Sequence, residues 1–402
     1  MLTITLLVLP VSAKTLRVGN DQTYKMLAAA LSDVKPADTI LLYTGVYKGG
    51  SIIHHLNGLP GQPITIMGRQ GDSVILRGGS EGLMLRSVAY LSIEHILFEQ
   101  QTSNGCNADD GGVVHEPSHH LVFSKCVFRN IAGTGNNDLL KLSGLDSFAI
   151  RDCIFLNGAK GGSGIDMVGC HYGVINNCRF ENMGSNAIQA KGGSQFIRIE
   201  RNFFNHCGER TLNLGGSTGL AFFRPVDATF EAADLQVYAN VIIGSDAPVA
   251  YVGCVRVSVV NNTIYQPERW VVRILQENNN PSRFIPCSNN EFRNNIICHG
   301  SKVKTDCNIG AGTDGGSFQF SNNYWFHLQD AGWKGPVGLP VADADAITGS
   351  DPLFTNISIH NFTIPFNSPV AGKGYESRFP EKDYSGNLFK SPRSIGAFEL
   401  RD

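Results

Sequence analysis

Lys191 is the residue whose surroundings in this sequence most favour chemistry. It ends the stretch NAIQAK at 186–191, where amide and apolar residues surround one cation, and two glycines follow it. A lysine amine in its neutral form takes up a proton, so it serves as a general base where its environment favours that form. Lys191 is therefore either a base on a substrate-binding face or a solvated side chain on a structural repeat.

Polar residues that would act with Lys191 lie at intervals along the neighbouring segments. We predict a catalytic group of Lys191, Arg210 and Asp166. The residues expected to contact a substrate are Lys141, Gln189, Asn213, Arg224, Trp270 and Arg273. This set suits β-elimination of a uronate-containing polysaccharide, in which a cation neutralises the sugar carboxylate, a base removes the C5 proton and an acid protonates the leaving oxygen. The oxygen ligands expected for a Ca²⁺ ion are Asp138, Asp166 and Glu209.

Two other classes of function stay open on the same residues. A glycoside hydrolase acting on an acidic polysaccharide needs two carboxyl groups about 5 to 10 Å apart, and Asp166 with Asp138 would supply them. A non-catalytic glycan-binding or surface-structural protein would use the same face without forming a product. The cluster His115, His119 and His120 has metal-binding side chains, but it lacks a fixed helical spacing.

An internal repeat predicts the elements that must position these residues. Segments such as SKCVFRN, RDCIFLN, NNCRFEN, ERNFFNH and VNNTIYQ recur, and most follow each other at intervals typical of one turn of a parallel β-helix. The residues at their third positions are Cys126, Cys153, Cys178, Asn202, Asn240, Asn262, Asn295 and Asn323. Stacked coils place equivalent residues above one another, so we expect an amide ladder continued by three small, buried thiols.

A second strand precedes each of these turns and carries the candidate site. Alternation of inward and outward residues predicts an outward column of Lys141, Asp166, Gln189, Asn213, Ala250 and Arg273. A second outward column contains Ser143, Val168, Lys191, Gly215, Val252 and Leu275. A long insertion at 215–235 is expected to rise beside this face, with Phe222, Phe223 and Arg224 as one wall of a cleft or packed on the coil side.

Composition agrees with an all-β chain that is exported. The 402 residues include 45 glycines and only 17% charged residues, and the net charge of −2 makes nucleic acid an improbable partner. Residues 1–13 resemble a signal peptide, so we expect a secreted or periplasmic monomer without a membrane span. Residues 14–402 then form one β-helix domain, with a helical cap near 24–34 and a capping segment at 350–402. Of the ten cysteines, Cys298 and Cys307 are the pair we consider for a disulfide.

The sequence resembles right-handed β-helix proteins of the pectate-lyase-like superfamily. The opening PADTILLYTGVYKGG and the closing SDPLF, NFTIPFNSPVAGKG and SIGAFEL carry this resemblance over nearly the whole chain. It implies a single-stranded right-handed parallel β-helix of about nine or more coils. AIQAKGGSQFIRIERNFF with TLNLGG is similar to part of the chondroitinase B and alginate lyase family, with Lys191 at the position of the family's strand lysine. That family's catalytic arginine is replaced here by Asn213, and its acidic calcium ligands before the lysine are replaced by Asn186 and Gln189.

Overall fold

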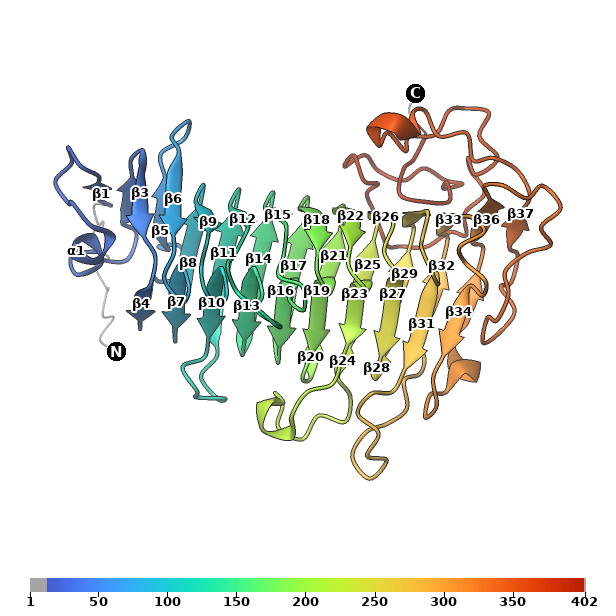
Figure 1. Ribbon diagram of the computed structural model, residues 1–402, viewed down its shortest axis with the longest axis horizontal. Helices are drawn as coiled ribbons and strands as arrows, with labels where there is room; N and C mark the ends of the chain where they lie inside the picture. The colour runs from blue at the N-terminus through green and yellow to red at the C-terminus, as the bar shows by residue number, and fades with distance from the viewer. Residues whose placement is uncertain (1–12, 401–402) are drawn as a thin grey trace, which may run out of the picture.

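The chain winds into a long coil of three parallel β-sheets that share one core (Figure 1). The structure is a computed structural model, and it describes residues 13–400. The expected signal peptide, residues 1–13, lies almost entirely outside this range. We refer to the sheets as A, B and C, which within residues 13–400 have 15, 12 and 10 strands respectively, and this arrangement confirms the predicted all-β class.

The bounds of the elements follow the coil order. Sheet A comprises β1 (Thr15–Val18), β2 (Thr39–Leu42), β5 (Ile64–Gly68), β8 (Ala89–Glu94), β11 (Ser118–Ser124), β14 (Leu145–Arg151), β17 (His171–Asn176), β20 (Ser194–Gln195), β21 (Arg198–Glu200), β24 (Ala232–Ala233), β25 (Gln236–Tyr238), β28 (Cys254–Val255), β29 (Ser258–Val260), β32 (Glu291–Arg293) and β35 (Gln319–Ser321). Sheet B comprises β3 (Gly45–Lys48), β6 (Val74–Arg77), β9 (Leu97–Glu99), β12 (Val127–Arg129), β15 (Ile154–Leu156), β18 (Arg179–Met183), β22 (Phe203–Cys207), β26 (Val241–Ile243), β30 (Thr263–Tyr265), β33 (Ile296–His299), β36 (Tyr324–His327) and β37 (Ile347–Thr348). Sheet C comprises β4 (Ser51–His54), β7 (Leu83–Arg86), β10 (Cys106–Asp109), β13 (Leu140–Ser143), β16 (Ser163–Val168), β19 (Asn186–Lys191), β23 (Arg210–Gly215), β27 (Ala247–Val252), β31 (Val272–Leu275) and β34 (Cys307–Ile309). The helical elements are α1 (Leu27–Leu31) and the short 3-10 turns η1 (Leu220–Phe222), η2 (Gly315–Ser317) and η3 (Ile357–Ile359).

The core is a stack of identical or similar side chains, one per coil. Phe128, Phe155 and Phe180 stack face to face inside sheet B, with ring centroids 5.1 and 4.6 Å apart. Phe98 and Phe204 extend this stack at its two ends. Because one coil cannot bury its inward residues alone, each coil depends on its neighbours for its hydrophobic contacts.

The predicted amide ladder is present at the corner between sheets A and B. Asn202, Asn240, Asn262, Asn295 and Asn323 are fully buried, and each of the first four donates its amide Nδ2 to Oδ1 of the next at 2.9 to 3.1 Å. The thiols of Cys126, Cys153 and Cys178 continue the column and donate to backbone carbonyls. All ten cysteines are free and buried, so the proposed bridge between Cys298 and Cys307 is wrong.

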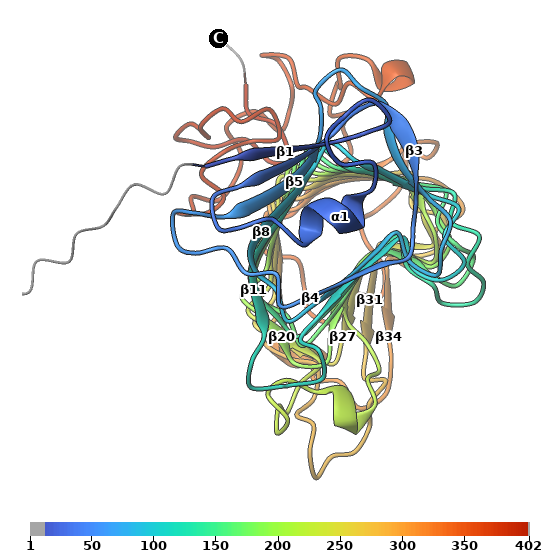
Figure 2. The same cartoon turned by 90° about the vertical axis from the view of Figure 1, so that its left-hand side faces the viewer.

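The two ends of the chain are covered in different ways. Helix α1 lies over the open N-terminal end of the coil, with Leu27 and Ala30 buried against the core (Figure 2). The predicted terminal cap at 350–402 has another position, because its described part lies along the side of sheet B. There Phe362 packs with residues of β22 and β26, and Ile364 packs with residues of β33 and β36. Trp333 is partly buried and packs against the main core.

Three long connections extend from the corner between sheets C and A and lie below the coil in Figure 1. They follow β10, β23 and β31, and the second contains η1. Within residues 13–400, no helix is long and apolar enough to cross a membrane.

Candidate functional site

The outward face of sheet C brings the predicted site residues into register. Lys141 pairs with Asp166, Asp166 with Gln189, and Gln189 with Asn213 on successive strands β13, β16, β19 and β23. The same column continues through Ala250 to Arg273 on β27 and β31. Successive side chains of a strand point to opposite faces of the sheet. Because Leu140, Ile165, Ile188 and Leu212 are buried in the core, the residues that follow them point outward.

Lys141, Asp166 and Lys191 form a charged cluster across three coils. The Lys141 ammonium pairs with Asp166 Oδ2, and the Lys191 ammonium lies 3.4 Å from the same oxygen. Lys191 Nζ also donates to Gln189 Oε1 at 3.3 Å. Asp166 is 3% exposed and its Oδ1 has no hydrogen-bond partner, whereas the two lysine side chains are about one-fifth exposed. The lysines are thus the part of the cluster that a bound molecule would meet.

Asp138 adds a second carboxyl group to the cluster. Its Oδ2 lies 3.7 Å from Lys141 Nζ, and its Oδ1 accepts the Ser163 backbone N–H at 2.8 Å. Burial, followed by the nearby Asp166 charge, raises the pKa of Asp138 to about 7. Burial acts to lower the pKa of Lys141, but the two carboxylates outweigh it and raise that pKa. Lys141 therefore stays charged, while Asp138 holds a proton in a large share of molecules at neutral pH.

Guanidinium groups occupy the next coils of the same face. Arg210 donates to Asn213 Oδ1 at 3.2 Å and to Glu277 Oε1 at 2.7 Å, and its side chain is 17% exposed. Arg273 lies over the Trp270 ring at 4.5 Å, and its Nε donates to Asn308. Burial, and then the neighbouring Arg210, lower the pKa of Arg273. The face is thus cationic on both sides of Gln189 and Asn213.

Arg224 does not reach this column. Its guanidinium forms two hydrogen bonds to Asp146, at 2.8 and 2.6 Å, and one to the Gly169 carbonyl. Burial opposes ionisation of Asp146, but His171 and Arg224 bind its charged form and hold its pKa well below the usual range. Arg224 therefore anchors the insertion to sheet A, and this engagement corrects the expectation that it points into a cleft. Phe222 is exposed and Phe223 is buried.

Two of the three carboxylates predicted for Ca²⁺, Asp138 and Asp166, do not fit that ion. Asp138 and Asp166 converge on the Lys141 ammonium, which takes the position where a cation would neutralise them. Among residues 13–400, no group of three histidine, cysteine, aspartate or glutamate side chains is arranged to hold a metal. His119 and His120 contact each other through Nδ1 atoms 2.9 Å apart.

Glu231 is a positioning residue that the sequence did not indicate. It is 1% exposed, and its Oε2 accepts the Gly192 N–H at 2.9 Å and the Thr218 hydroxyl at 2.7 Å. Its Oε1 accepts from the Thr218 N–H and from Asn278. Glu231 thereby fixes the corner that follows Lys191. Its position within an irregular insertion leaves no periodic signal.

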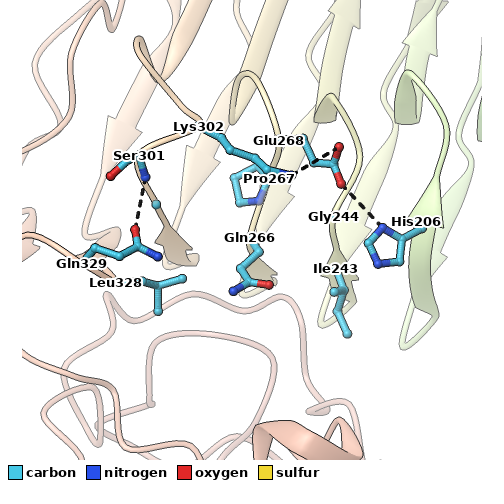
Figure 3. A pocket seen from close by; sticks show the side chains of 11 residues that line it. His206, Ile243, Gly244, Gln266, Pro267, Glu268, Ser301, Lys302, Leu328 and Gln329 are labelled. Carbon is cyan, nitrogen blue, oxygen red and sulfur yellow. Dashed lines mark hydrogen bonds and ion pairs between the residues drawn. The ribbon is translucent and has the colours of Figure 1, made fainter.

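A separate hollow of about 440 Å³ lies at the corner between sheets B and C (Figure 3). Glu268 stands between His206 at 3.7 Å and Lys302 at 3.9 Å, and Gln266 and Gln329 also point toward the space. His206 belongs to β22, whereas Glu268 and Lys302 belong to connections, and the side chains of His206 and Lys302 are exposed. The hollow does not include the Lys191 cluster.

Comparison with known proteins agrees with this architecture. Residues 81–264 match a family model described as a right handed beta helix region. The crystal structure of pectate lyase Pel9A superposes with a TM-score of 0.65 at 14% identity, covering 97% of this chain and 98% of that chain. The chain folds as a right-handed parallel β-helix, the fold that it shares with this pectate lyase.

Two further solved structures share this β-helix. An alginate lyase from Paenibacillus sp. str. FPU-7 has a TM-score of 0.50 at 15% identity, covering 75% of this chain and 97% of that chain. The GH136 lacto-N-biosidase from Eubacterium ramulus has a TM-score of 0.57 at 12% identity, covering 83% of this chain and 67% of that chain. No curated protein sequence matches the chain significantly. Identities this low show the fold alone, so the activity must be argued from the site.

Proposed function

We propose that this β-helix is a secreted or periplasmic lyase that cleaves uronate-containing polysaccharides by β-elimination. The observation that carries the proposal is the accessible Lys191 amine beside Asp166, Gln189 and Lys141 on one face of sheet C. The names of two solved structures with this fold, a pectate lyase and an alginate lyase, support the same substrate class.

In the proposed reaction, Lys191 takes the proton from C5 of the sugar next to the cleaved bond. The electrons of the C5–H bond form the C4–C5 double bond, and the C4–O bond breaks. Arg210, one coil beyond Lys191, is the guanidinium we assign to the sugar carboxylate, whose neutralisation makes the C5 proton more acidic.

We assign the proton of the leaving oxygen to Asp138, which is 4% exposed and delivers it through the Lys141 ammonium 3.7 Å away. Its pKa of about 7 leaves a protonated carboxyl available at neutral pH, as general acid catalysis requires. Asp166 touches both lysines, and we assign it the role of positioning Lys191. The mechanism uses no metal ion, because the Lys141 ammonium already lies between the two carboxylates.

The test is incubation of the purified protein with alginate, polygalacturonate and glycosaminoglycans while ultraviolet absorbance of the unsaturated uronate is followed. We expect absorbance to rise on one polymer, and Lys191→Ala to reduce the rate by a factor of about 100 or more. Lys125→Asn is the matched control, because Lys125 is exposed at a corner remote from sheet C and has the left-handed backbone that asparagine tolerates. Full activity of Lys191→Ala would remove this residue from the mechanism.

Glycoside hydrolysis is the second candidate, and the paired carboxyl groups are the observation that favours it. Asp138 and Asp166 both contact Lys141 Nζ, so their nearest oxygens lie within about 8 Å of each other, below the upper limit of the separation that glycosidases use. The raised pKa of Asp138 would suit the acid of such a pair. Release of reducing ends without any rise in ultraviolet absorbance would establish hydrolysis and contradict the lyase. Binding without any product would contradict both.

A further inference from the structure

A column of left-handed residues runs along the corner where sheet A begins. The residue directly before each of them pairs in register with the equivalent residue on the adjacent coil. The column contains Tyr90, His120, Ser147, Tyr172, Phe196, Asp234 and Arg256, all with φ between 50° and 58°. Such backbone conformations are unfavourable for residues other than glycine, asparagine and aspartate. The geometry of the coil imposes these backbone conformations whatever the side chain. The side chains found at these positions therefore reflect the function of the surface.

Aromatic side chains are an unusual choice for such a column. The equivalent left-handed column between sheets B and C carries asparagine, which tolerates this backbone well, at 130, 157 and 182, with Gln100 and His206 on either side. Tyr172 and Phe196 are instead 59% and 47% exposed, so burial does not offset the conformational cost. Their rings lie parallel, 5.2 Å apart at 9°, and Tyr90 and His120 stack in the same way at 4.4 Å. Folding alone does not explain exposed rings at these positions.

Tyr172 and Phe196 border a groove on the outer surface of sheet A. The groove has a volume of about 400 Å³, within the range of ligand sites. Its other border is a row in register along the sheet, formed by Val174, Arg198, Gln236 and Ser258. The groove thus spans four coils, about 14 Å at about 4.8 Å per step, and runs along the axis of the β-helix.

The charges in the groove are already paired. Arg256 forms two hydrogen bonds of 2.8 Å to Asp234, and Arg198 Nε lies 2.9 Å from Glu200 Oε2. The charges of these four side chains sum to zero, so the groove does not offer the cationic field that a polyanion would need. It offers flat apolar rings beside fixed donors and acceptors. A sugar ring has the complementary surfaces, an apolar face of C–H groups and a rim of hydroxyls.

We propose that this groove binds an uncharged stretch of a polysaccharide chain, separately from the lysine face. Figure 2 shows sheet A, with β8 and β11, on a different side of the coil from sheet C, with β27 and β31. The coils that carry Tyr172 and Phe196 also carry Asp166 and Lys191. A chain held in the groove would therefore keep the protein on its polymer while the lysine face engages another segment. The proposal does not depend on the reaction assigned to Lys191.

The test is affinity gel electrophoresis of the full chain in gels that contain xylan, galactan or mixed-linkage β-glucan, with alginate and polygalacturonate as acidic comparisons. We expect retardation on at least one uncharged polymer. Tyr172→Asn and Phe196→Asn should each weaken this binding, and together they should raise the dissociation constant by about tenfold or more. Because asparagine suits the left-handed backbone, the melting temperature of these variants should not fall.

Control variants separate binding in the groove from binding elsewhere on the molecule. Phe366→Ala removes a ring that is 90% exposed elsewhere, and it should leave retardation unchanged. Lys191→Ala should also leave retardation on the uncharged polymer unchanged, which distinguishes the groove from the lysine face. Absence of retardation on every uncharged polymer, or retardation that both asparagine variants retain, would overturn the proposal. Light scattering that shows a dimer lost in these variants would assign the rings to a second copy of the chain, and it would also overturn the proposal.

Discussion

Lys141 holds the candidate site together because two buried carboxyl groups converge on its ammonium. The alternation of strand residues was enough to predict that Lys141, Asp166 and Gln189 share a column, and the structure confirms it. The same alternation did not reveal that Asp138, which precedes the strand, turns back toward Lys141. Side chains on connections follow no two-residue period, so the contact of Asp138 with Lys141, the role of Glu231 and the Arg224–Asp146 pair required the structure.

Asp138 predicts a pH dependence of stability. Its pKa is about 7 in the folded chain, against an ordinary value of 3.8, so the folded state holds a proton that the unfolded state has lost between about pH 4 and 7. Stability from this group therefore falls as pH rises through that window. The amide that Asp138→Asn introduces has the shape of the protonated acid. We therefore expect the free energy of unfolding of this variant to decrease less with rising pH than that of the original chain, by up to a few kcal/mol. Urea unfolding at pH 5 and pH 8 measures the difference.

Asp306 provides the comparison for this experiment. Burial raises the pKa of Asp306 to about 6. Asp306 therefore also lowers the free energy of unfolding as pH rises, but over a narrower range that ends about one pH unit lower. Asp306→Asn should flatten the curve below about pH 6 and leave the part between pH 6 and 7 unchanged. If Asp138→Asn leaves the whole curve unchanged, burial and the Asp166 charge do not hold a proton on Asp138 in the folded chain.

At the scale of elements, the amide ladder joins successive coils at the corner between sheets A and B, where some strands are only three residues long. The repeat of asparagine at the third position predicted this ladder from the sequence, because stacked coils must place equivalent residues together. The sequence could not show how the connections after β10, β23 and β31 pack. Their contacts, such as Phe223 against Phe284, join segments with no common period.

Asn262→Asp tests the ladder. Asn262 is fully buried, donates Nδ2 to Asn295 Oδ1 at 3.0 Å and accepts from Asn240 at 2.9 Å. Aspartate has the same shape but loses the donor and brings a charge into a buried site, so we expect a loss of about 3 kcal/mol or more in the free energy of unfolding. Asn157→Asp is the matched control, because Asn157 belongs to an exposed ladder with Asn130 and Asn182.

The two variants are compared by urea unfolding at pH 7. Asn157→Asp should lose less than about 1 kcal/mol, since water solvates both its charge and its unpaired neighbours. Equal losses at the two sites would mean that burial of the ladder does not determine its contribution to stability.

At the scale of the whole molecule, the side of sheet B is covered by the segment that follows β37. The sequence resemblance identified residues 350–402 as a capping segment, but only packing decides which surface such a segment covers. The outward residues Phe203 and Ile243 of sheet B are apolar and would otherwise be exposed, and their cluster includes Phe362 from the segment. An uncovered apolar face of this kind would promote association between molecules.

Phe362→Ala tests whether the segment is an integral part of the fold. Phe362 is fully buried, with ring centroids 5.4 Å from Tyr265 and 5.0 Å from Phe354, so its truncation should cost about 3–5 kcal/mol. Phe366→Ala, four residues further and 90% exposed, should change stability by no more than about 0.5 kcal/mol. Limited proteolysis distinguishes local from global loss, because a segment that detaches alone will be cleaved near residues 350–400 while the coils resist. Cleavage throughout the coils of Phe362→Ala would show instead that the segment and the β-helix unfold as one unit, because the contacts across sheet B then couple the two.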